Sequence, residues 1–90
     1  MAGPVTAEAL RAEILRQTRA RGPAKSICPS EVARALAPEA WRPLLGAVRA
    51  AAAELHAEGA VQILRKGRPV PPEAMHGVIR LRQPPEGESA

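Results

Sequence analysis

The sequence contains no phenylalanine, no tyrosine, no aspartate and no asparagine, and each of these absences narrows what the chain can do. Without Phe or Tyr, the core must be built from Leu, Ile, Val and Ala, with Trp41 as the sole aromatic anchor beneath a turn. Single-stranded nucleic acids are usually bound by several exposed aromatic side chains, so that class of ligand is disfavoured. Without Asp or Asn, a catalytic histidine would lack the side chain that commonly orients it.

Cysteine is nearly absent as well, since Cys28 is the only one. This excludes an internal disulfide and a multi-cysteine zinc site, and it fits a reducing compartment. The first residues lack the basic start and apolar run of a signal peptide. No stretch approaches the roughly 18 consecutive apolar residues that a membrane-spanning helix needs. We therefore expect a cytoplasmic protein without a membrane partner.

Acidic residues are outnumbered, and the 90-residue chain has a formal charge of +4 and a pI of about 10.6. A basic small domain points to nucleic acid or another polyanion. A composition rich in Ala, Arg, Gly and Pro would also follow from GC-rich coding, so the location of the charge is more informative than its total. Five basic residues and one acidic residue lie between Gly59 and Arg82, which gives this segment alone the net charge of the whole chain.

The hydrophobic periodicity predicts three helices. Thr6 caps the first, which ends at Gly22. The proline after Cys28 suits the first position of a short second helix, which makes Cys28 a buried cap residue, and "APEA" ends that helix. The third helix carries a clean apolar stripe from Trp41 and ends at Gly59.

Two short runs with β-branched residues, "AVQILR" and "VIRLR", predict strands separated by the long loop "KGRPVPPEAMHG". The segment "AKSIC" is expected to be extended, with Ile27 pointing inward. This order of elements is that of a winged helix-turn-helix: mainly α with a small β-hairpin (α+β), with three helices and a two- or three-stranded antiparallel wing. We expect the domain to span residues 6–82, between a flexible N-terminus (1–5) and a disordered acidic tail (83–90).

Several stretches are similar to a known family. "CPSEVARAL", "WRPLLGAVRAAAAEL", "KGRPVPPE" and "GVIRLR" resemble an uncharacterised bacterial family of small proteins, and the resemblance runs from Ala7 to Arg82. It implies a winged-helix-like fold and no established activity. Val78 stands where the family more often has Pro, and Pro71 where it often has Asp. The position of Pro71 is therefore a poor catalytic candidate.

The location of the arginines favours binding to double-stranded DNA, and less so to structured RNA. Arg42 and Arg49 lie two turns apart on the third helix, the one that enters the major groove in helix-turn-helix proteins, and are candidates for base or phosphate contacts. Arg34 on the second helix could contact the neighbouring DNA strand. A basic wing commonly lies along phosphates, and the candidates there are Arg65, Lys66, Arg68 and Arg80.

Other interpretations of these residues stay open. The arginines could be solvated surface residues, and Arg80 and Arg82 could protect a strand edge from aggregation. A small core is marginal, so a homodimer or another protein partner could pack on the outward face of the third helix, formed by Gly46, Ala50, Ala53 and Ala57.

An enzymatic interpretation would pair Cys28 with His56 or His76 as its base. A cysteine at a helix N-terminus can be reactive, but it is more often a small buried hydrophobe. The sequence has no glycine-rich anion loop and no paired carboxylates in an apolar setting. We therefore assign no catalytic, cofactor-binding or metal-binding residue.

Overall fold

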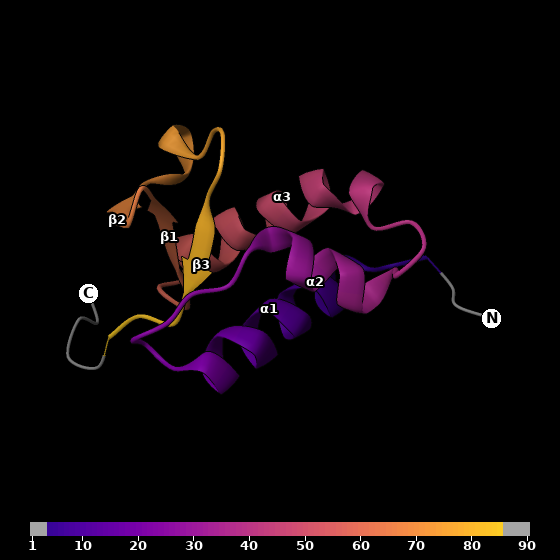
Figure 1. The fold of residues 1–90 in the computed structure, drawn as a ribbon, viewed down its shortest axis with the longest axis horizontal. Coiled ribbons are helices and arrows are strands. Elements are labelled where there is room, and N and C mark those ends of the chain that lie inside the picture. Colours follow the sequence, from indigo (N-terminus) through magenta and orange to yellow (C-terminus); the bar gives the residue numbers. More distant parts are fainter. Residues whose placement is uncertain (1–3, 86–90) are drawn as a thin grey trace.

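The computed structural model describes residues 4–85. Three helices lie beside a small sheet at one end of the molecule (Figure 1). In chain order the elements are α1 (Ala7–Arg21), α2 (Pro29–Leu36), the 3-10 turn η1 (Arg42–Leu44), α3 (Leu45–Ala57), β1 (Gln62–Arg65), β2 (Arg68–Val70), the 3-10 turn η2 (Pro72–Ala74) and β3 (Arg80–Arg82). Most of the expected flexible N-terminus and acidic tail, residues 1–3 and 86–90, lies outside the described residues.

Local signals set the helix ends. The hydroxyl of Thr6 accepts a hydrogen bond from the backbone N–H of Ala9 at 3.0 Å, which satisfies a free donor at the start of α1. Cys28 is the N-cap of α2 as predicted, and its own N–H donates to the Glu31 carboxylate at 2.7 Å. Cys28 is half-buried rather than buried. The third helix departs from the prediction, since its first turn around Pro43 is 3-10 and the α-helix begins at Leu45.

The sheet has the order β2-β1-β3, and all its pairings are antiparallel. Ile27 extends it by one bridge, exchanging two 2.8 Å backbone hydrogen bonds with Leu81. The sequence predicted this inward, extended Ile27 but placed a long loop where β2 lies. A two-residue turn joins β1 to β2, with φ of 53° at Lys66 and 79° at Gly67. Positive φ at both positions is the requirement of a type I′ hairpin turn.

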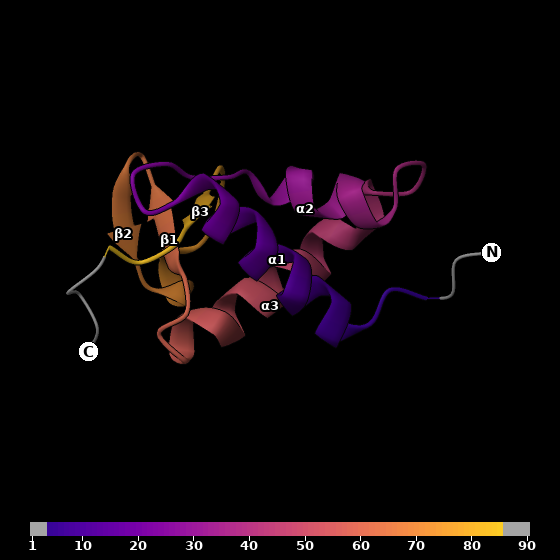
Figure 2. The same cartoon turned by 90° about the horizontal axis from the view of Figure 1, so that it is seen from below.

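Aliphatic side chains from all three helices and the sheet make the core. The ribbons of α1 and α3 cross in the view of Figure 2. The most deeply buried include Ile14, Ile27, Val48, Leu55, Ile63 and Leu81. Trp41 packs against this cluster but is only partly buried, so it sits at the edge of the core and does not anchor its centre. None of the helices within residues 4–85 is long and apolar enough to cross a membrane.

The architecture is therefore an α+β winged helix, in which α2 and α3 form the helix-turn-helix and the sheet with its connections forms the wing. Ile79 and Leu81 point into the core, whereas Val78 and Arg80 are exposed on the opposite side of the chain. This alternation places Arg80 on the solvent-exposed side of β3.

Candidate nucleic-acid interface

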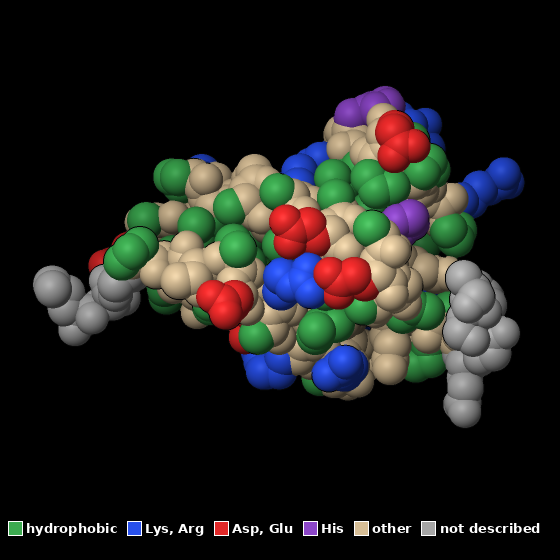
Figure 3. All heavy atoms as spheres, turned by 180° about the vertical axis from the view of Figure 1, so that it is seen from behind, with side chains coloured by type: hydrophobic (Ala, Val, Ile, Leu, Met, Phe, Trp, Pro, Cys, Tyr) green, Lys and Arg blue, Asp and Glu red, His purple; other side chains and the backbone are tan. Residues whose placement is uncertain are grey.

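Three of the four arginines of α1 form ion pairs within the molecule, and only Arg19 has no ion-pair partner among residues 4–85. Arg11 forms ion pairs with Glu54 at 3.2 Å and Glu58 at 2.7 Å, and Arg16 pairs with Glu13 at 2.5 Å. Acidic and basic side chains consequently alternate over the face formed by α1 and α3 (Figure 3). The guanidinium of Arg16 lowers the pKa of Glu13, and that of Arg11 lowers the pKa of Glu58, because each hydrogen-bonds the ionised carboxylate.

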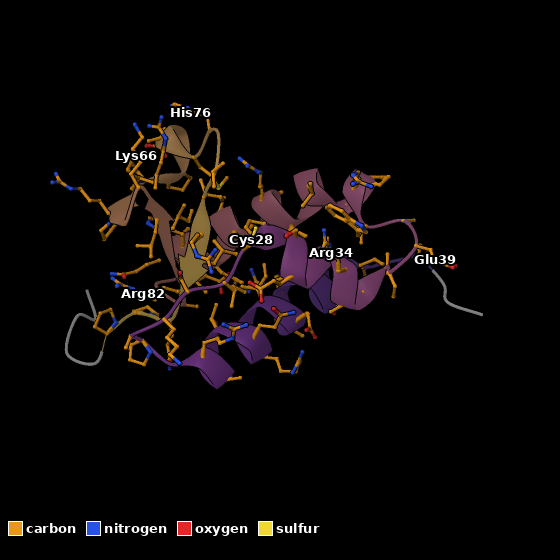
Figure 4. The ribbon with its side chains drawn as sticks, in the orientation of Figure 1. Cys28, Arg34, Glu39, Lys66, His76 and Arg82 are labelled. Atoms are coloured by element: carbon orange, nitrogen blue, oxygen red, sulfur yellow. The ribbon has the colours of Figure 1, made fainter. Side chains whose placement is uncertain are left out.

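The wing carries positive charge that has no such partner. Lys66 and Arg68 are exposed and Arg65 is half-buried. Within residues 4–85, none of the three forms an ion pair or a hydrogen bond through its side chain. These three predicted contacts therefore lie together at the β1–β2 turn with their charges available. Figure 4 shows Lys66 projecting from the wing.

A second group of cations lies at the turn between α2 and α3. The guanidinium carbons of Arg34 and Arg42 lie 4.3 Å and 4.5 Å from the centre of the Trp41 ring. Both arginines are exposed, and neither has an ion-pair partner among the described residues. Stacking on the indole restrains the two planar groups while leaving their N–H edges open. The sequence predicted both arginines as contacts but did not predict that Trp41 holds them together.

Arg49 and Arg80, two further predicted contacts, are engaged inside the molecule. Arg49 donates hydrogen bonds to the backbone oxygens of Met75 at 3.2 Å and Gly77 at 2.5 Å. Arg80 donates through Nε to the Ser26 hydroxyl at 2.6 Å and through Nη2 to the Ser26 carbonyl at 2.9 Å. Each guanidinium thus positions a part of the wing, with only its remaining N–H groups free for a ligand.

The outward face of α3 is almost without polar side chains. Gly46, Ala47 and Ala50 are exposed there. Between residues 45 and 57 the only polar side chains are those of Arg49, Glu54 and His56, of which Arg49 contacts the wing and Glu54 contacts Arg11. Because base edges are read by hydrogen-bond donors and acceptors, this face allows a nucleic acid to approach the helix closely but is not suited to direct base readout.

Cys28 and His76, which the enzymatic interpretation would pair, lie in different parts of the domain. Figure 4 places Cys28 in the body of the domain and His76 at the top of the wing. The Cys28 sulfur accepts a hydrogen bond from the Ser30 hydroxyl at 3.2 Å. In the part of the chain that the structure describes, no three His, Cys, Asp or Glu side chains gather where they could hold a metal ion.

Comparison with protein families identifies the chain by a family model. The protein-family model described as "Protein of unknown function (DUF3253)" matches residues 7–84, which is nearly the whole described chain. No curated protein matches this sequence.

Proposed function

This chain belongs to that family, whose description assigns no activity, and we propose from the arrangement of its charges that the domain binds double-stranded nucleic acid, DNA foremost, through the phosphates. One observation carries the proposal. Three of the four arginines of α1 form ion pairs with carboxylates, whereas those of the wing and of the Trp41 cluster form none among residues 4–85. A cluster of exposed cations without ion-pair partners is typical of a polyanion site.

The position of the two cationic groups supports a duplex as the polyanion. The Trp41 cluster lies where α3 begins, and Arg49, one turn into α3, contacts the wing. The small-residue face of α3 lies between them, so a duplex backbone can approach the helix closely while both cationic groups contact phosphates. We expect little sequence preference, because the face toward the groove lacks base-reading side chains.

A protein partner on the same face of α3 is the second candidate. Gly46 and Ala50 are exposed, and a self-associating helix pair favours such small residues at its contact. Sedimentation at low concentration separates the two candidates. A dimer that becomes monomeric when Ala50→Glu is introduced, together with absence of duplex binding, would replace the DNA proposal with this one.

The test of duplex binding is a salt titration. Fluorescence anisotropy with two short duplexes of unrelated sequence is expected to give similar affinities. The logarithm of the association constant should fall linearly with the logarithm of the salt concentration. The double variant Lys66→Ala/Arg68→Ala is expected to lower the magnitude of the slope by about 1 to 2, since each lost phosphate contact contributes about 0.9.

A matched control removes the same charge elsewhere. Arg19 and Lys25 are exposed on α1 and in the loop after it, and they form no ion pair within residues 4–85. Arg19→Ala/Lys25→Ala should leave the slope almost unchanged if the wing makes the contacts. Equal losses in the two double variants would show that net charge alone is responsible, and absence of binding at low salt would end the proposal.

A further inference from the structure

A groove runs along the base of the wing. Its larger part has a volume of about 450 Å³, with Leu64 and Val78 among its walls and Ser26 at its edge. A smaller hollow of about 170 Å³ adjoins it, because Gly77 and Val78 line both. The larger part is within the size range of sites that bind small molecules.

The groove is cationic. Arg65, Lys66 and Arg80 line the larger part, and no carboxylate of residues 4–85 does. Three positive groups around one cavity match a phosphate dianion with its three terminal oxygens better than a carboxylate with its two.

Arg80 is already held in place. Two of its five N–H donors are bound to the hydroxyl and carbonyl of Ser26, so three remain for a ligand. Because Ser26 fixes the guanidinium before a ligand arrives, less side-chain entropy is lost on binding. An arginine held on one edge and open on the other is suited to receive an anion.

The apolar wall narrows the ligand class further. Val78 is 84% exposed and is the only exposed large hydrophobic residue in the described part of the chain. Leu64 adds further apolar surface to the groove, whereas no aromatic side chain lines it. The wall therefore fits the C–H groups of an aliphatic or sugar-like body and offers no aromatic ring on which a nucleobase could stack.

We propose that this groove binds a small phosphate monoester with a compact non-aromatic body. Since Arg65 and Lys66 also belong to the proposed duplex interface, an occupied groove would weaken duplex binding. Only this competition rests on the proposed function, because binding of the monoester itself requires no duplex.

The experiment is an NMR titration of backbone amides with butyl phosphate, inorganic phosphate and butyrate, at constant pH and ionic strength. Butyl phosphate is expected to cause saturable shifts at Ser26, Gly67, Gly77 and Arg80. Inorganic phosphate lacks the apolar body and butyrate lacks the dianion, so both should bind several-fold more weakly. No saturable shift with butyl phosphate, or equal binding of all three anions, would overturn the proposal.

Variants locate the site. Arg80→Gln is expected to weaken butyl phosphate binding roughly tenfold or more, since a charged hydrogen-bond donor is lost. Arg82→Gln removes the same charge from the same strand, but Arg82 contacts Gln62 and does not line the groove, so it is the matched control. Val78→Glu adds a negative charge at an exposed position outside the core, and should abolish binding. Unchanged binding in Arg80→Gln and Val78→Glu would refute the site.

The same probe tests competition. Butyl phosphate should lower duplex affinity more than KCl added to the same ionic strength. If the domain binds butyl phosphate but no duplex, the phosphate monoester site is supported and the proposed function is wrong. If it binds duplex but not butyl phosphate, the proposed function is supported and the phosphate monoester site is wrong.

Discussion

Arg49, in α3, donates a hydrogen bond of 2.5 Å through Nη2 to the carbonyl oxygen of Gly77, 28 residues further along the chain. A second N–H group of the same guanidinium reaches the carbonyl of Met75 at 3.2 Å. These contacts fasten the return segment of the wing to α3. They thereby set the position of the wing cations relative to the helix and hold Gly77 at the wall of the groove.

Loss of this contact should loosen the wing before the rest of the domain. Arg49→Ala is expected to lower the free energy of unfolding by about 1 to 2 kcal/mol, because two hydrogen bonds from a charged donor are removed. Amide hydrogen exchange should accelerate at residues 75–78 while α1 stays protected. Arg49→Lys keeps the charge but not the two-pronged geometry, so it should restore only part of the loss.

Urea unfolding followed by circular dichroism measures the stability change, and Arg68→Ala is its control. Arg68 is an exposed wing residue, and its replacement is expected to change stability by less than about 0.5 kcal/mol. If Arg49→Ala behaves like Arg68→Ala in both measurements, the contact with Gly77 does not fasten the wing.

The fold was largely predictable because its signals are local. Thr6 and the Cys28–Pro29 pair mark helix starts by their own chemistry, and the alternation around Ile79 and Leu81 gives the buried side of β3. β2 was missed because "RPV" is only three residues long and contains a proline. It forms because the turn at Lys66 and Gly67 folds it onto the open edge of β1.

The candidate site was predictable in charge but not in geometry. The concentration of basic residues in the wing follows directly from the sequence. The partners of Arg49 and Arg80 do not, since each donates to backbone oxygens that are distant in the chain, with Ser26 lying 54 residues before Arg80. A carbonyl acceptor carries no residue-specific signal, so only the folded chain shows that these two arginines are engaged.

Trp41 provides a direct probe of the proposed interface because it is the only tryptophan. Its ring lies beneath the guanidinium groups of Arg34 and Arg42, so a duplex bound to them should shield the indole and reduce its quenching by acrylamide. Trp41→Leu removes both cation–π contacts, each worth about 0.5 to 1 kcal/mol at an exposed site. It is expected to weaken duplex binding a few-fold, because the two arginines become more mobile.

Anisotropy measurements over the same range of salt concentrations check the expected loss of duplex affinity in Trp41→Leu. Arg34→Ala/Arg42→Ala should weaken binding at least as much as Trp41→Leu, and adding Trp41→Leu to that double variant should cost little more affinity. Unchanged acrylamide quenching at saturating duplex would show that the nucleic acid does not reach this end of the domain.

Stability should fall in acid, partly through Glu13. Its carboxylate accepts hydrogen bonds from Arg16 and, at 2.7 Å, from Gln17, and the Arg16 hydrogen bond is the main cause of its lowered pKa. Because the folded-state pKa lies below that of an unfolded chain, about 4.3, the ionised carboxylate stabilises the fold above that pH. This contribution disappears as pH falls through the folded-state value.

The urea midpoint should therefore be lower at pH 3 than at pH 7, and Glu13→Gln should reduce that difference by lowering stability mainly at pH 7. Glu39→Gln removes an exposed carboxylate that has no ion-pair partner among residues 4–85, and serves as the matched control. Arg16→Gln should reproduce the effect of Glu13→Gln in part, since Gln17 still donates to the carboxylate. A full pH difference retained in Glu13→Gln would place the acid sensitivity at other carboxylates, with Glu58 beside Arg11 the next to test.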